Sequence, residues 1–222
     1  MIRIASLLRR LARDDRAIAL SEFALASPLI LMLGMVGVES SNLALVHMRV
    51  SQIAANLADT TSRVGQDSVL SLKQIRETDI NDAFQAVRLQ GGNYNITTHG
   101  RVILSSLETN ASNGQYIRWQ RCVGKLAVTS SYGVAGNGAT GTSFPGMGPS
   151  GAEIKAPNGQ AVMFVEIQYD YQPLISNRFF GPKRIKTTSA FIVRDPRDLS
   201  SANNPSNPAP TVTASNCNVY GT

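Results

Sequence analysis

The fold is decided by the stretch Ala17–Ile18–Ala19–Leu20–Ser21–Glu22–Phe23, which continues as an apolar run to Val38. Residues 17–38 contain no Lys or Arg, and their strongly polar members are Ser21, Glu22 and Ser27. About 20 apolar residues span the hydrocarbon core of a bilayer, so we expect a membrane-spanning helix over about residues 18–38. A carboxylate in such a helix costs roughly 2–4 kcal/mol to insert, which makes Glu22 a candidate functional residue.

A basic leader precedes the apolar run. Residues 1–16 carry five Arg against Asp14 and Asp15, a balance of +3 within a net charge of +6. Positive charge beside an apolar segment marks its cytoplasmic side, so residues 1–17 are predicted to be a cytoplasmic leader. The other basic residues are scattered and form no stripe interleaved with aromatic residues, so we expect no nucleic-acid partner.

Three interpretations of this N-terminal region compete. A secretory signal peptide has a shorter apolar core with a small-x-small cleavage site after it, and Val38–Glu39–Ser40 is a poor site of that kind. A plain signal anchor fits every feature except Glu22. The third interpretation is a prepilin-type leader, which is cut before the apolar run rather than after it.

The stretch Arg16–Ala17–Ile18–Ala19–Leu20–Ser21–Glu22–Phe23–Ala24–Leu25–Ala26–Ser27–Pro28–Leu29 resembles the TadE/TadG-like minor pseudopilins of tight-adherence (Flp) pili. That family has a basic leader, a Gly, four residues, Glu-Phe, then Ala-Leu and Pro-Leu. The resemblance implies cleavage by a prepilin peptidase between Ala17 and Ile18, with Ala17 in place of the family's Gly. It is confined to the N-terminal helix, and the rest of the chain adds only composition and layout.

The resemblance also implies that Glu22, Phe23 and Pro28 serve assembly. Cleavage would expose an amine at Ile18, which neighbours Glu22 at i and i+4 on a helix. In low dielectric this amine, or that of an adjacent subunit, would neutralise the carboxylate and set the axial register. The alternative is a protonated Glu22 near the headgroups without a partner. Pro28 removes one helical hydrogen bond and predicts a local kink.

The helix is expected to continue beyond the membrane to about residue 64. A narrow stripe recurs at steps of three and four: Leu43, Val46, Val50, Ile53, Leu57, Thr60 and Val64. This stripe packs either on the domain that follows or on the helix of another subunit. Gly65 is a predicted helix stop.

Residues 65–195 predict a periplasmic α+β domain, with an antiparallel sheet and a second helix, as pilin-like proteins have. The second helix is expected over about residues 70–89. Short strands rich in Val, Ile and aromatic residues are expected at 101–107, 116–122, 125–132, 161–171 and 185–194. In residues 161–171 apolar and polar side chains alternate, which predicts a sheet with one covered face.

Two segments predict irregular structure. Gly136, Gly138 and Gly141 spell G-x-G-x-x-G, but the Pro-containing residues 142–149 cannot supply the helix that a dinucleotide site needs. We therefore expect a flexible surface loop and no cofactor. Residues 196–222, rich in Pro, Asn and Ser, predict a flexible tail tied by Cys217.

The two cysteines, Cys122 and Cys217, lack the neighbouring Cys or His of a metal site. Outside the cytoplasm they can form a disulfide, which loop-closure models credit with about 4–5 kcal/mol. The alternative is two unrelated thiols. His47 and His99 belong to no nucleophilic or metal-binding motif, so we expect no catalytic residue and no metal.

Together these features predict a minor pilin-like, TadE-like subunit of a tight-adherence pilus, single-pass in the bacterial inner membrane. Its expected partners are that membrane, a prepilin peptidase and other pilin-like subunits with their assembly machinery. One alternative is an anchored periplasmic binding module that enters no fibre. A second is an anchored envelope enzyme, which would need a polar pocket with convergent titratable groups.

Overall fold

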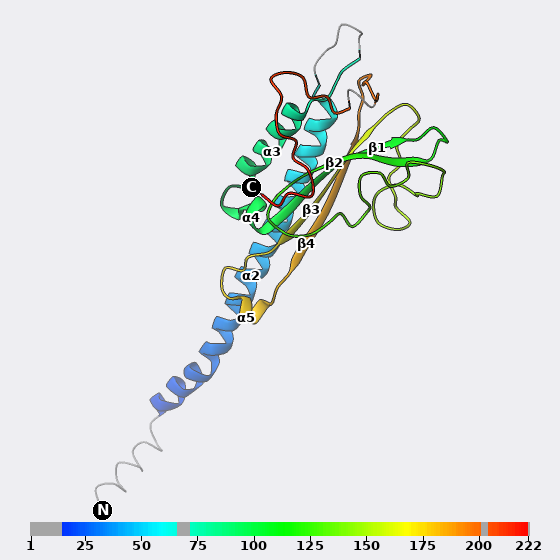
Figure 1. The fold of residues 1–222 in the computed structure, drawn as a ribbon. Coiled ribbons are helices and arrows are strands. Elements are labelled where there is room, and N and C mark those ends of the chain that lie inside the picture. The colour runs from blue at the N-terminus through cyan, green and yellow to red at the C-terminus, as the bar shows by residue number, and fades with distance from the viewer. Residues whose placement is uncertain (1–14, 66–71, 201–203, 222) are drawn as a thin grey trace, which may run out of the picture.

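A computed structural model describes residues 15–65, 72–200 and 204–221, so most of the predicted leader lies outside the described residues. One long helix, α2 (Asp15–Arg63), runs the whole length of the molecule. Its second half packs with helix α3 (Glu77–Gly91) against a four-stranded sheet, and its first half projects beyond the domain (Figure 1). The predicted α+β class is confirmed.

The sheet is antiparallel throughout, in the order β2-β1-β3-β4. Its strands are β1 (Gly100–Thr109), β2 (Gln115–Val123), β3 (Val162–Asp170) and β4 (Arg184–Ile192). Short helical turns η1 (Gly92–Tyr94) and α4 (Ile96–His99) link α3 to β1, and α5 (Asn177–Phe180) lies between β3 and β4. Four of the five predicted strands are present.

The predicted strand at residues 125–132 is wrong. These residues run as irregular chain across the sheet, because their polar groups bind side chains of β3 instead of a neighbouring strand. The hydroxyl of Ser130 donates to Glu166 at 2.7 Å, and the amide of Gln168 donates to the carbonyl of Thr129 at 3.0 Å.

The stripe on α2 packs on the domain. Val46, Val50, Ile53 and Leu57 are buried against the sheet and α3, whereas Thr60 is exposed. Ala54 and Ala58 are also buried and widen the stripe, which lets the helix approach the sheet closely. The helix is therefore a core element of the domain as well as its extension.

Both faces of β3 are covered, contrary to the single covered face that its alternation predicts. Glu166 and Gln168 are 1% and 2% exposed, and their partners are the backbone and hydroxyls of residues 129–131. Alternating polarity does not distinguish a polar face in water from one satisfied by a covering loop.

Residues 136–149, predicted to be a flexible surface loop, help to cover this face of the sheet. Met147 is fully buried in a second apolar cluster with Phe164, and Tyr132 contacts Phe164 edge-on at 5.6 Å between ring centroids. Gly138 adopts φ +76°, and a Cβ there would lie 2.0 Å from the carbonyl oxygen of Gln115. Glycine is needed at this position because the backbone passes so close.

Helix α3 begins at Glu77, so residues 72–76 of the helix predicted over 70–89 are not helical, and residues 70 and 71 lie outside the described residues. Residues 73–76 form isolated parallel bridges with the C-terminal segment, Lys73 with Arg197 and Arg76 with Ser206. Asp79, in the first turn of α3, accepts the backbone N–H of Arg76 at 3.0 Å. Pairing with a segment distant in sequence thus replaces the first predicted turns.

The C-terminal segment packs along the domain rather than forming a free tail. A disulfide joins Cys122 of β2 to Cys217, as predicted. Arg101 is fully buried beneath it and donates to the carbonyls of Gly124, Cys217 and Val219 at 2.6–2.8 Å. Its guanidinium lies 4.3 Å from the ring centroid of Tyr220, and burial lowers its pKa.

Candidate functional site

The candidate site is the projecting part of α2 and its junction with the domain. Within the described residues, α2 is the one helix long and apolar enough to span a membrane. Its large apolar side chains up to Val38 are exposed, among them Leu25 at 76% and Leu33 at 73%. Residues 18–38 number 21, about 31 Å of helix, which matches a hydrocarbon core of about 30 Å. The apolar projection thus has the length of a membrane span.

The residues predicted for processing and assembly all lie on this projection. Ala17 and Ile18 are inside α2, which begins at Asp15, and the helix continues without interruption through Pro28. Glu22 and Phe23 are exposed, and the hydroxyl of Ser21 donates to the carbonyl of Ile18 at 2.8 Å. The helix places Ile18 and Glu22 one turn apart, in the i, i+4 relation that charge pairing requires.

The domain begins at Glu39, which sequence reasoning did not select as a site residue. Glu39 is 1% exposed, although Val38 before it is 58% exposed. Its carboxylate accepts a hydrogen bond from the hydroxyl of Tyr171 and another from the backbone N–H of Ile175 at 3.1 Å. The amide of Asn42 donates to the Tyr171 oxygen at 2.6 Å. A short polar chain therefore joins the helix to the end of β3.

At this junction the buried hydroxyl of Tyr171 is protonated and bonds to Glu39. Burial, and then the hydrogen bond to Glu39, raise the pKa of Tyr171 to about 12. The hydroxyl therefore stays protonated across the physiological range and donates to the Glu39 carboxylate. A buried carboxylate without such partners would carry a large desolvation cost, so Glu39 and Tyr171 depend on each other.

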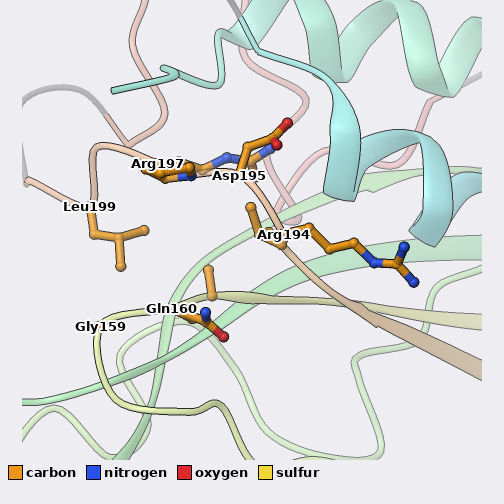
Figure 2. A pocket seen from close by; sticks show the side chains of 9 residues that line it. Gly159, Gln160, Arg194, Asp195, Arg197 and Leu199 are labelled. Carbon is orange, nitrogen blue, oxygen red and sulfur yellow. The ribbon is translucent and has the colours of Figure 1, made fainter. Parts of the chain in front are cut away.

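A second feature is a small pocket of about 230 Å³ at the opposite end of the domain (Figure 2). Gly159 and Gln160 line it from the turn before β3, and Arg194, Asp195, Arg197 and Leu199 line it from the segment after β4. Asp195 pairs with Lys73 at 2.8 Å, which lowers the pKa of the carboxyl.

The guanidinium of Arg197 binds the end of helix α2. Arg197 is 8% exposed, and its Nη2 donates to the carbonyls of Thr61 and Val64 at 3.1 and 2.6 Å. Those carbonyls end α2, where a positive charge also complements the helix dipole. Burial lowers the pKa of Arg197 to about 10, so the group stays charged at neutral pH. The guanidinium thus caps the helix on which the projecting segment is built.

Glu108 lies near this end of the sheet and is 4% exposed. Its Oε1 accepts from Ser106 at 2.8 Å and from the amide of Asn204 at 2.7 Å, while Asn204 accepts from the indole N–H of Trp119. Burial raises the pKa of the Glu108 carboxyl. This network joins the C-terminal segment to the sheet, and all its members have partners.

The two histidines lie apart from each other in the fold. His47 is exposed on α2, and His99 is half-buried at the end of α4. Within residues 15–65, 72–200 and 204–221, no three His, Cys, Asp or Glu side chains gather as metal ligands. Residues 18–38 offer apolar contact and the Glu22 carboxylate, and Glu39 and Tyr171 form a polar junction at their base.

No family model matches the chain, and neither a curated protein nor a solved structure is significantly similar to it.

Proposed function

We propose that this chain is a membrane-anchored, TadE-like pilin subunit that takes part in assembling a tight-adherence pilus at a bacterial inner membrane. The observation that carries the proposal is Glu22, exposed near the start of a bare apolar projection whose length equals a hydrocarbon core. An ordinary anchor gains nothing from a carboxylate there, whereas a subunit that packs against others can pair it.

The charge of the leader and the disulfide support the proposed topology. The leader, with its Arg residues, stays in the cytoplasm, and the domain lies in the periplasm. The disulfide between Cys122 and Cys217 supports this assignment, because such bonds persist in oxidising compartments. The partners are the inner membrane, a prepilin peptidase and other pilin-like subunits.

Glu22 acts by charge pairing. Removal of the leader exposes an amine on Ile18, and that amine lies one helical turn from Glu22. In the bilayer each charge is costly alone, and the pair is favoured within one chain or between neighbours. Pairing between neighbours fixes the axial register of packed helices.

The processing step is tested by the intact mass of protein extracted from membranes. A chain that starts at Ile18 supports the proposal, because the prepilin peptidase cuts before the apolar run. A chain that starts at Met1 contradicts processing. That result instead favours an anchored periplasmic module, an alternative suggested by Ala17 in place of the family's Gly.

Assembly is tested with Glu22→Gln, which removes the charge and keeps the shape of the side chain. We expect normal insertion but reduced recovery in the sheared pilus fraction or in crosslinked subunit complexes. Ser27→Ala, a change of similar size on the same helix, is the control and retains recovery. Equal recovery of both variants and the wild type contradicts the role of Glu22.

A further inference from the structure

The loop between β3 and β4, residues 172–183, is fixed at the level where α2 leaves the domain. The backbone N–H of Ile175 donates to Glu39, and the N–H of Tyr171 donates to the Lys183 carbonyl at 2.8 Å, which closes the base of the loop. Figure 1 shows α5, in this loop, beside α2 at the end of the domain nearest to the projecting helix. The loop therefore cannot move far from Glu39.

This loop presents an apolar side chain and a cation to solvent. Leu174 is 66% exposed, although both Tyr171 and Ile175 near it are held by the junction. Pro182 and Lys183 are also exposed. Pro182 and Lys183 line a depression together with Asn177, Arg184 and residues 170–172.

The end of the domain that carries this loop is positively charged. Lys183 and Lys186 are exposed, and Arg184 is balanced by Asp170 through an ion pair at 2.6 Å. An exposed leucine beside exposed lysines is the arrangement that binds an anionic membrane surface, with the apolar group at the acyl boundary and the amines at the phosphates.

We propose that residues 172–183 dock on the anionic phospholipid surface of the membrane that α2 crosses. Leu174 enters the boundary between headgroups and acyl chains, and Lys183 contacts lipid phosphates. The proposal rests on the anchoring part of the proposed function, because residues 18–38 place Glu39 at the hydrocarbon edge and hence the loop at headgroup depth. A helix and a loop together hold the domain at one tilt.

The depth of the loop is tested with tryptophan reporters in the full-length protein, reconstituted in vesicles of phosphatidylcholine and phosphatidylglycerol with brominated acyl chains. The wild type has one Trp, the buried Trp119, which sets the baseline. We expect Leu174→Trp to show quenching above this baseline. Leu89→Trp, at a similarly exposed site (74%), is the matched control and stays at the baseline.

Leu89 is a suitable control because it lies farther from the membrane. The carbonyl of its neighbour Gln90 accepts from Arg49, which is ten residues beyond Glu39, about 15 Å along α2. Quenching of Leu174→Trp no greater than that of Leu89→Trp overturns the docking proposal.

A third reporter separates this failure from failure of the anchor. Leu29→Trp lies within the apolar projection and is quenched if the helix spans the bilayer. Quenching at residue 29 without quenching at residue 174 overturns docking and leaves the anchor standing. Absence of quenching at residue 29 overturns both, because the docking proposal depends on the span.

The charge is tested by adding Lys183→Gln to the Leu174→Trp protein. One lysine near an anionic surface changes the ratio of bound to free loop about fivefold. We expect Lys183→Gln to lower this ratio about fivefold in vesicles that contain phosphatidylglycerol. In vesicles of phosphatidylcholine alone, we expect it to lower the ratio less. Lys155→Gln, an exposed lysine whose neighbour Ala156 bonds to Gln115 at the far end of the sheet, leaves quenching unchanged. Equal effects of the two variants overturn the role of Lys183.

Discussion

The carboxylate of Glu39 and the hydroxyl of Tyr171 form a hydrogen bond across 132 residues of sequence, at the point where helix α2 leaves the domain. Both side chains are buried, at 1% and 3% exposure. The bond attaches Tyr171, which directly follows β3, to Glu39, the first buried residue of α2 from residue 18 on. It therefore sets the place where the apolar projection ends and the domain begins.

Tyr171→Phe is expected to destabilise the domain by roughly 1–3 kcal/mol, because the buried Glu39 carboxylate loses a donor. The measurement is urea unfolding of the full-length protein in detergent, followed by the fluorescence of Trp119. Asn42→Ala, which removes only the outer donor to Tyr171, is expected to cost less. A change below about 0.5 kcal/mol for Tyr171→Phe, the range of neutral surface substitutions, contradicts a structural role for the bond.

The same tyrosine predicts a loss of stability at high pH. Its pKa is raised from 10 to about 12 in the folded protein, so its contribution is complete below pH 10. The contribution falls as the pH rises from 10 towards 12, since the unfolded chain loses the phenolic proton first. We expect the free energy of unfolding to fall more steeply over this interval in the wild type than in Tyr171→Phe. Parallel curves for the two proteins would be evidence against the raised pKa.

Removal of the disulfide is expected to release the C-terminal segment. The double variant Cys122→Ser, Cys217→Ser opens a loop of 95 residues, for which chain-entropy models give a cost of up to about 4–5 kcal/mol. Limited proteolysis should then cleave residues 204–221 first, because this segment is then held without a covalent bond, by hydrogen bonds such as those from Arg101 to Cys217 and Val219. Wild-type protein treated with reductant provides an independent comparison. If the double variant and the reduced wild type both resist the protease, the disulfide does not hold the C-terminal segment in place.

Arg197→Met is expected to fray the end of α2. The variant keeps most of the apolar stem but leaves the carbonyls of Thr61 and Val64 without their charged donor, at a cost of about 1.5–3 kcal/mol. Hydrogen exchange should accelerate at residues 60–64. Arg194→Met changes an exposed arginine of the same segment and should leave exchange there unaltered. Comparable exchange in the two variants argues against capping by Arg197.

The sequence was sufficient for the parts of the fold that depend on local periodicity. The stripe from Val46 to Leu57 predicted which face of α2 is buried, and runs of β-branched and aromatic residues predicted four strands within a few residues. Residues 125–132 have the composition of a strand, but their partners are the side chains of Glu166 and Gln168. Such partners lie too far along the chain for periodicity to reveal them.

The candidate site also contains residues that the sequence indicates and residues that only the structure shows. Glu22 stands out because a charge interrupts an apolar run, which is visible in the sequence itself. Glu39 directly follows the apolar run, and Tyr171 ends an alternating strand, but nothing local indicates that the two residues meet. Arg101 and Arg197 were also missed, because long basic side chains are usually solvated and only the structure shows the carbonyls that bind them.

The continuity of α2 has a mechanical consequence. The helix that carries Glu22 is one continuous rod, and its second half packs beside α3 against the sheet. Turning the domain about the rod's axis turns the acidic side chain by the same angle. In the proposed assembly, the orientation of the folded domain thereby selects the direction from which a neighbouring helix can reach the Glu22 carboxylate.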